Sequence, residues 1–396
     1  MIPRPIGLGA RLAALHAASF GGIGIYVPFF PIWLESRGLP ASWIGIVLAL
    51  PIIVRVLVTA PLMTLADRSM GARRLIAAAC LGVSVIYLTL LAAGNPVVIA
   101  VLVIFMAVAQ APIIPAADLV TIQAIRREPR LDYGRLRLWG SIAFLIASIG
   151  GGYLLEVLPA DAVIWFLFSL AICAIATAWA VVPDSAAARV DAGERPPASA
   201  ASGKLPLALW FVIGAGACTQ ASHGALYAFG SIHWRDLGFS SATIGLLWAI
   251  GVVAEILVFA FLGRGVGRGS AAVGLILVGA GAGIFRSAAL AADPGLATTF
   301  ALQALHGLTF GATHLGTMGA LAHLAPDGAR GRAQGLMASA HALAMASATG
   351  LSGLVFRAAS PTVFLAMVPL AAAGFAFALL ALRAARAQPH KAAGGG

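Results

Sequence analysis

The chain is a succession of long apolar runs separated by short polar segments. A helix that crosses a bilayer needs about 20 apolar residues, and runs of that length recur along almost the whole sequence. Open strand edges cannot be satisfied in lipid, so spanning segments of this kind are expected to be helices. We predict an all-α membrane protein with twelve spans, at 10–34, 41–65, 75–93, 96–123, 136–158, 161–183, 206–233, 240–262, 271–292, 295–324, 334–356 and 360–382.

One polar stretch divides these runs into six and six. Residues 184–205, DSAAARVDAGERPPASAASGKL, are typical of a flexible linker. The predicted organisation is an N-terminal half at 1–183, this linker on the cytoplasmic side, a C-terminal half at 206–383 and a disordered tail at 384–396. A faint repeat supports two pseudo-symmetric bundles, because RGLPASWIGIVLAL (37–50) aligns with LGFSSATIGLLWAI (237–250).

Composition excludes a water-soluble fold. Of the 396 residues 61% are hydrophobic and 10% are charged, and the mean hydropathy is +0.97, whereas soluble domains carry roughly 25% charged residues. The net charge of +11 would suit a nucleic-acid binder if the basic residues were not so unevenly placed. With the N-terminus inside, 20 of the 25 Lys and Arg fall on the cytoplasmic side and three on the other. This bias predicts a bacterial-type inner membrane protein with both termini cytoplasmic and no nucleic-acid partner.

Four strongly ionisable residues lie deep within the predicted spans: Arg55, Asp118, Glu255 and Arg286. A charge at the bilayer centre costs at least ~2.5–3.5 kcal/mol, so each of these residues is expected to have a partner or a polar environment that offsets this cost. One interpretation is two structural ion pairs, Glu255 with Arg286 and Arg55 with Asp118. The other is a polar cavity that these residues line.

Other polar residues favour the cavity. On the seventh span Gln220, His223 and Tyr227 share one helix face, and on the tenth span Gln303 and His306 share another, with His314 beside it. The predicted substrate-binding residues are Arg286, Arg55, His306, His314, Gln220, His223, Tyr227 and Gln303. The three cysteines lie far apart within spans and show no metal-ligand spacing, so no metal is predicted.

Several stretches resemble one family. They are FFPIWLESRGL (29–39), LDYGRLRLWGSIAF (131–144), QASHGALYAFGSIHW (220–234), TIGLLWAIGVVAEILVFAF (243–261) and ALHGLTFGATHLGTM (304–318). The chain resembles the major facilitator superfamily, and within it the 3-phenylpropionic acid transporter group, itself similar to the lactose-permease and nucleoside-symporter branch. The four intramembrane charges, His306 and His314 stand where that pattern has the same residue types.

The resemblance implies uptake of an aromatic monocarboxylate with protons, by alternating access of two halves around a midplane site. Arg286 would then hold the carboxylate, and Glu255 or Asp118 would carry the proton, since burial disfavours the charged form of a carboxyl group. The partners would be protons, a small organic anion and the lipid bilayer. No cofactor is expected beyond the proton gradient, and the protein is expected to be a monomer.

Two basic loops are candidate gating segments. LADRSMGARR (65–74) keeps Asp67, Arg68 and Arg73 of the superfamily signature, but its glycine is one place late. In the YGRLR loop, Tyr133, Arg135 and Arg137 would latch a closed state on acids such as Asp132 or Asp327. The alternative is that these arginines only follow the positive-inside rule.

Several other functions share the same sequence features. A proton-driven exporter of hydrophobic drugs and a sugar or nucleoside symporter would have the same fold. A membrane-embedded enzyme or a receptor is disfavoured, because the chain has no His-Glu-x-x-His, no Gly-x-Ser-x-Gly and no P-loop. We therefore expect a carrier rather than an enzyme.

Overall fold

The structure is a computed structural model that describes residues 7–65, 71–181, 204–263, 269–326 and 329–387, and these ranges hold helices and no strands. The helices are α1 (Leu8–Ser36), α2 (Ala41–Leu65), α3 (Gly71–Ala92), α4 (Pro96–Gln110), α5 (Ile113–Arg127), α6 (Tyr133–Leu154), α7 (Ala162–Val181), α8 (Leu207–Ala221), α9 (Gly224–Asp236), α10 (Ser241–Leu262), α11 (Gly269–Leu290), α12 (Leu296–Ala304), the π-helix η3 (Gly307–Ala312), α13 (Thr313–Leu324), α14 (Arg330–Ala358), α15 (Thr362–Leu365) and α16 (Val368–Ala387).

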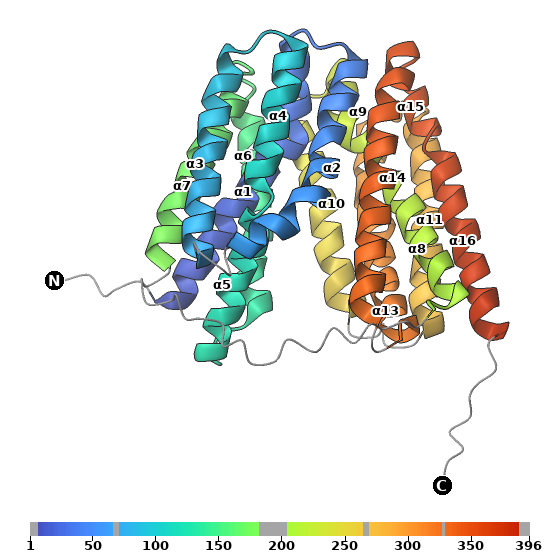
Figure 1. Cartoon of the computed structure of the whole chain (residues 1–396). Helices are drawn as coiled ribbons and strands as arrows, with labels where there is room; N and C mark the ends of the chain where they lie inside the picture. Colours follow the sequence, from blue (N-terminus) through green and yellow to red (C-terminus); the bar gives the residue numbers. More distant parts are fainter. Residues whose placement is uncertain (1–6, 66–70, 182–203, 264–268, 327–328, 388–396) are drawn as a thin grey trace. The chain divides into compact units, whose positions relative to one another are not determined.

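Every predicted span is met by one helix or by consecutive helices, which confirms the all-α fold (Figure 1). Four spans are built from pieces: α4 with α5, α8 with α9, α12 with η3 and α13, and α15 with α16. In the described part of the chain, nine helical segments are long and apolar enough to cross a membrane. The last helix runs on to Ala387, past the predicted start of the tail at 384.

The helix breaks have local causes. Between α4 and α5 stands Pro112, which has no N–H to donate and therefore weakens a helix at that point. Between α12 and α13 the chain widens into the π-helix η3, a rare form that is frequent at functional sites. The break between α8 and α9 falls at Ser222 and His223, which places a histidine at the joint.

The same helix corner occurs twice, 200 residues apart. α1 ends at Ser36 and α9 ends at Asp236, and each helix is followed by a glycine with positive φ, +77° at Gly38 and +86° at Gly238. In both corners the glycine N–H bonds a carbonyl three residues back, at 2.8 Å. A left-handed residue after a helix is a common C-terminal cap and favours glycine, so the weak sequence repeat has a matching backbone geometry.

The chain forms two compact units. The first is Met1–Arg195 with Tyr227–Ala249, and the second is Pro196–Leu226 with Ile250–Gly396. The predicted linker lies almost wholly outside the described residues, so its boundaries stay a prediction. α10 contributes its first half to the first unit and its second half to the second.

In the first unit, α6 and the start of α10 cross with almost no space between them. The Ser148 hydroxyl donates to the Gly245 carbonyl at 3.0 Å. A Cβ on Gly152 would lie 2.5 Å from the Ser241 carbonyl oxygen. Beyond the end of α6, Glu156 accepts from the Ala242 N–H at 3.1 Å. The Ser240 hydroxyl and this N–H hold the pKa of the exposed Glu156 carboxyl below its ordinary value.

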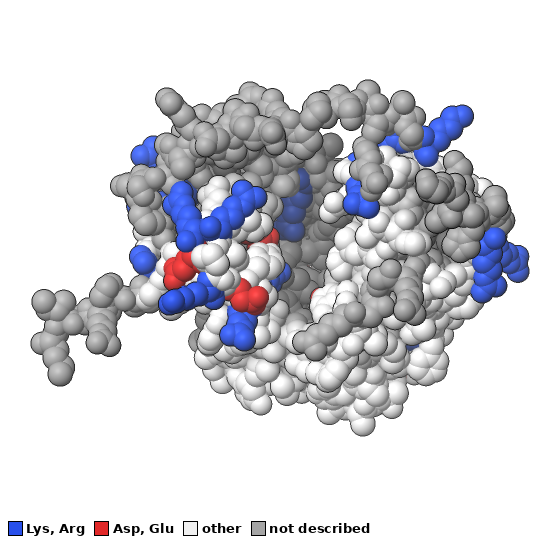
Figure 2. Space-filling view, turned by 90° about the horizontal axis from the view of Figure 1, so that it is seen from below, with Lys and Arg blue, Asp and Glu red and all other residues white. Residues whose placement is uncertain are grey.

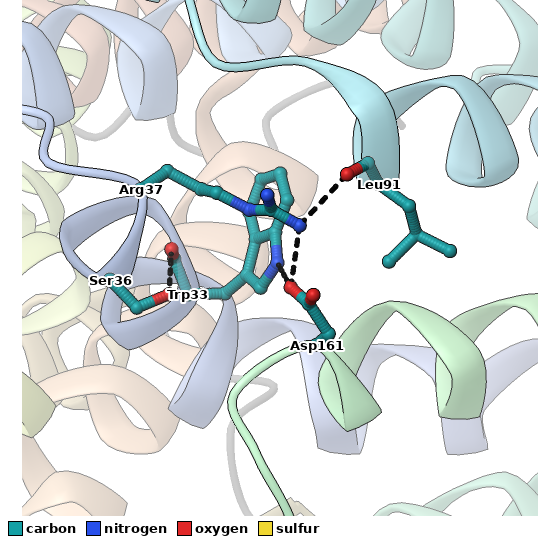
Figure 3. A network of polar contacts seen from close by, with 5 residues as sticks. All are labelled: Trp33, Ser36, Arg37, Leu91 and Asp161. Carbon is teal, nitrogen blue, oxygen red and sulfur yellow. Dashed lines mark hydrogen bonds and ion pairs between the residues drawn. The ribbon is translucent and has the colours of Figure 1, made fainter.

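Polar contacts also join the helix ends of the first unit (Figure 3). Arg37 donates to Asp161 at 2.6 Å and to the Leu91 carbonyl at 3.0 Å, and the Trp33 indole donates to the same carboxylate at 3.0 Å. The guanidinium also lies 5.2 Å from the centre of the Trp33 ring. These contacts tie the ends of α1 and α3 to the start of α7.

Arg235, at the end of α9, pairs with Glu35 at the end of α1. The opposite end of the helices carries many of the basic residues. Figure 2 views that end, and blue Lys and Arg side chains project from it. Which side of a membrane this end faces stays a prediction from the positive-inside rule.

The α6–α10 crossing can be tested with two glycines of one helix. We expect Gly152→Ala to lower the melting temperature of the detergent-solubilised protein, because overpacking a close contact costs about 1–3 kcal/mol. Gly150→Ala is the matched control, since a Cβ there meets nothing within 4 Å. Equal melting temperatures for the two variants would contradict the close approach of α6 and α10.

Candidate transport site

The second unit buries an arginine in its interior. Arg286, on α11, is 3% exposed. Its Nη2 donates to the side-chain amide oxygen of Gln303, and its Nη1 lies 3.4 Å from the Thr309 hydroxyl and 3.4 Å from Nδ1 of His306. All three partners belong to the tenth span, on α12, on η3 or at the joint between them. The break in this span therefore gathers polar side chains around one guanidinium.

His223 joins the same group from the seventh span. Its Nε2 lies 2.8 Å from the Thr309 hydroxyl, and its Nδ1 lies 3.1 Å from the Gln220 carbonyl. The rings of His223 and His306 meet edge to face at 5.2 Å. Thr309 thus lies within hydrogen-bond distance of both Arg286 and His223, and it links the three helical spans of the site.

A small cavity of about 10 Å³ adjoins Arg286 and His223. This is roughly the space that one water molecule needs. Ser222 and Ser287 add hydroxyl groups to its wall, and the rest is mostly apolar, with Leu226, Leu290, Phe364 and Met367 among the lining residues. The arrangement combines a cation, hydroxyl groups and an apolar wall, which is the chemistry needed to hold an anion with an apolar body.

A column of rings continues from the site along the tenth span. His306 stacks on Phe310 at 5.4 Å, and Phe310 stacks on His314 at 6.1 Å. Phe259 of α10 meets His314 edge to face at 6.0 Å. His314 therefore lies two ring contacts away from His306, outside the first group of contacts around Arg286.

Glu255 lies beside this column, on α10. The two spans approach closely through glycines: a Cβ on Gly251 would lie 3.4 Å from the Cβ of His306, and one on Gly307 would lie 2.6 Å from the Ala254 carbonyl. A Cβ on Gly311 would lie 3.6 Å from the Cγ of Glu255. Glu255 is thus one helix turn from the residue that packs on His306.

The first unit holds a separate polar cluster. The Tyr133 hydroxyl donates to Asp118 at 3.0 Å, and His16 of α1 lies 2.9 Å from the Thr121 hydroxyl. The rings of His16 and Tyr133 meet edge to face at 6.4 Å. Asp118, predicted as a proton carrier, and Tyr133, predicted as a gating residue, are therefore direct partners.

The pair of Arg55 with Asp118, one of the two interpretations of the intramembrane charges, is not formed. Arg55 donates to the Gln110 side chain at 2.8 Å, and Gln110 donates to the Tyr87 hydroxyl at 2.9 Å. Asp118 instead accepts from Tyr133. Arg55 and Asp118 therefore belong to separate groups of contacts, one with Gln110 and Tyr87 and the other with Tyr133.

The remaining predicted residues lie in different places. Tyr227 stacks on Trp248 at 5.8 Å. The Arg73 guanidinium lies 3.9 Å from the Trp179 ring centre, and that of Arg137 lies 3.5 Å from the centre of Phe20. Asp132 accepts from the N–H of Arg135 at the start of α6. Asp67, Arg68 and Asp327 lie outside the described residues.

The family model that describes the MFS_1 like family matches residues 10–366, which is most of the chain. The chain belongs to this family. It is a major facilitator transporter by family and by fold, and the proteins it resembles are transporters rather than enzymes.

Relatives of this MFS_1 like protein carry transporter names. It is 29% identical over 310 residues to the "Probable 3-phenylpropionic acid transporter" of Escherichia coli (strain K12), covering 78% of this chain and 80% of the relative. It is also 29% identical over 154 residues to the maltose permease of Geobacillus stearothermophilus, covering 39% of each chain.

Solved structures share the fold of this family member at low sequence identity. The nucleoside transporter NupG matches with a TM-score of 0.78 and 15% identity, over 96% of this chain and all of that one. A D-xylose-proton symporter matches with a TM-score of 0.67 and 14% identity, over 94% and 96% of the two chains. These similarities establish the fold.

Sequence reasoning missed several residues of these clusters in the MFS_1 like chain, among them Thr309 and His16. Thr309 was not singled out, although HGLTFG places it three residues after His306 in a glycine-rich stretch. His16 was not singled out either, because one histidine in an apolar helix gives no pattern. In the described part of the chain, no group of three or more His, Cys, Asp or Glu residues could hold a metal ion.

The role of Thr309 as a shared partner predicts a stability effect. Thr309→Val should lower the free energy of unfolding by about 1–3 kcal/mol, the usual cost of leaving buried polar groups without their partner. Thr309→Ser keeps the hydroxyl group and should lose much less. Thermal unfolding of both variants in the same detergent checks this, and equal losses would contradict the shared hydrogen bonds.

Proposed function

We propose that the protein imports a small organic anion, of the aromatic monocarboxylate class, together with protons by alternating access. The observation that carries the proposal is the buried Arg286 guanidinium beside a cavity with hydroxyl groups and an apolar wall. The name of the Escherichia coli relative supports the same substrate class.

The chemistry of Arg286 suits a carboxylate. A guanidinium offers a planar fork of donors that can bind both carboxylate oxygens at once. Ser222, Ser287 and His223 line the same cavity and would contribute hydrogen bonds, while Phe364 and Met367 would contact an aromatic ring. Methionine is flexible and adapts its packing.

The cavity in this structure is much smaller than a site for such a ligand. Ligand pockets usually measure roughly 300–1,000 Å³, against about 10 Å³ here. Binding would therefore require the side chains around Arg286 to move apart. In alternating access, a change of this kind accompanies substrate entry.

Glu255 is the proposed proton carrier. A carboxyl group within a span is more easily protonated than one in water, and Glu255 lies on the helix that packs on His306 and η3. Loss of its charge would alter the electrostatic environment of Arg286 and favour release of the guanidinium to the substrate. Asp118, with Tyr133 and His16 nearby, is the second candidate carrier.

The setting we propose is a bacterial plasma membrane, with both termini cytoplasmic and a monomeric carrier driven by the proton gradient without a cofactor. Two other transport functions compete. The maltose permease match favours a sugar substrate, but a buried arginine among histidines suits an anion better than a neutral sugar. Export of hydrophobic drugs would use the same fold in the opposite direction.

One prediction of the proposed function concerns the substrate. Proteoliposomes with a more acidic exterior should accumulate 3-phenylpropionate, and collapse of the pH gradient should abolish accumulation. Arg286→Lys keeps the charge but loses the fork, so uptake should fall by roughly ten- to hundredfold, the value of a hydrogen bond to a charged group. Arg357→Lys, at an exposed position of α14, is the control.

If the proteoliposomes accumulated maltose or a nucleoside and not 3-phenylpropionate, the proposed substrate class would be wrong. If accumulation occurred only when the interior was the more acidic side, the proposed direction of transport would be wrong. Both results would be read on protein whose monodispersity and helix content match the wild type.

Another prediction of the proposed function concerns the coupling of substrate transport to protons. Glu255→Gln should abolish accumulation against a gradient while exchange of labelled for unlabelled substrate continues, because exchange needs no net proton movement. Glu128→Gln, at an exposed residue after α5, should behave as wild type. If Glu255→Gln kept full proton-driven accumulation and Asp118→Asn lost it, Asp118 would be the carrier.

A further inference from the structure

A groove of about 440 Å³ lies between α1 and α6, within the first unit. One side of the groove is lined by small residues of α1, among them Ala10, Ala14 and Ala17. The other side is lined by Leu136 and Trp139 of α6. The volume falls within the range of small-molecule sites, roughly 300–1,000 Å³, and it is far larger than the cavity beside Arg286.

The groove lies on a different side of α1 from the polar cluster. Residues two apart on an α-helix point roughly 160° away from each other, so Ala14 faces away from His16, which contacts Thr121. Ala10, Ala14 and Trp139 are exposed. In a protein whose solvent is the bilayer, an exposed groove with this apolar lining suits an acyl chain.

One charged group completes the groove. Arg135 lines it in the first turn of α6, which begins at Tyr133. Its side chain is exposed, and no other lining residue is charged. Neighbouring arginines have other contacts: Arg11 donates to the Ala180 carbonyl at 2.9 Å, and Arg137 lies over Phe20. Arg135 is thus the basic residue placed to meet a ligand in the groove.

We infer that this groove binds one anionic phospholipid, with an acyl chain along the small residues of α1 and the phosphate on Arg135. The position fits, because α1 and α6 both begin at this end, and tryptophan is enriched where helices meet headgroups. The bilayer is itself apolar, so the tail gains from close packing against small side chains rather than from leaving water. Selectivity among lipids then rests on the charge of the headgroup.

The inference rests on the membrane fold and is independent of the proposed transport function. Its test uses the full chain in detergent, titrated with dioleoylphosphatidylglycerol or dioleoylphosphatidylcholine, with bound lipid measured by native mass spectrometry. The wild type should bind the anionic lipid about fivefold more tightly, the effect of one basic residue near a charged headgroup. Arg135→Gln should remove this preference.

Two further variants test the tail. Ala14→Phe fills the groove and should reduce retention of both lipids. Ala78→Phe is its matched control: Ala78 is exposed near the start of α3, on a face that also exposes Leu81 and Val85. Arg130→Gln removes an exposed charge that does not line the groove. Both controls should bind lipid as the wild type does.

The named results either support or overturn the assignment. It fails if Arg135→Gln keeps the headgroup preference, if Ala14→Phe retains lipid, or if Arg130→Gln loses the preference equally, which would indicate a general basic surface. Glycerol 3-phosphate, which has the phosphate but no acyl chains, should bind far more weakly than the phospholipid. Equal binding would mean a free-phosphate site and would also overturn the inference.

Discussion

A guanidinium buried within a bundle of apolar helices constrains most of what surrounds it. Arg286 is almost fully enclosed, and a charge in such a place is tolerated only with good hydrogen-bond partners. A regular α-helix uses its own backbone groups internally and offers few polar side chains on one short face. The tenth span supplies Gln303, His306 and Thr309 at the point where it departs from regular α-helix.

The break in the seventh span serves the same centre. The chain leaves α8 at Ala221 and enters α9 at Gly224, and His223 lies between them with its ring on Thr309. The two irregular segments meet where the charge is buried. Irregular backbone at membrane depth is tolerated where it is enclosed by protein or lines a cavity, and the small cavity beside Arg286 meets that condition.

The sequence was sufficient to predict the spans and the residue types around Arg286, but it was not sufficient to predict which side chains contact each other. Run length and polarity predicted every span, because the thickness of a bilayer leaves little choice. Of the eight predicted substrate-binding residues, Arg286, Gln303, His306 and His223 lie together, whereas Arg55 contacts Gln110. The pair of Arg55 with Asp118, one of the two interpretations that the sequence left open, is not formed, and the partners are Gln110 for Arg55 and Tyr133 for Asp118.

Two other residues show contacts that spacing along one helix does not predict. The helical spacing placed Tyr227 on the face of His223, and in the structure its ring stacks on Trp248. His16 gave no signal, because its partners Thr121 and Tyr133 come from helices more than a hundred residues away in sequence. A contact between distant segments is set by packing, and one sequence without relatives contains no direct record of it.

α10 shows how close packing and charge are combined in one helix. Its first half crosses α6 at Gly245, and its second half packs on the tenth span at Gly251 and carries Glu255. Ten residues separate Gly245 from Glu255, which is about 15 Å along a helix. The helix is continuous from Ser241 to Leu262 and contains no proline, so the two contacts are joined by a stiff rod. The α6 crossing fixes the first half of α10 closely, because a Cβ on Gly245 would lie 2.2 Å from the Ser148 carbonyl oxygen.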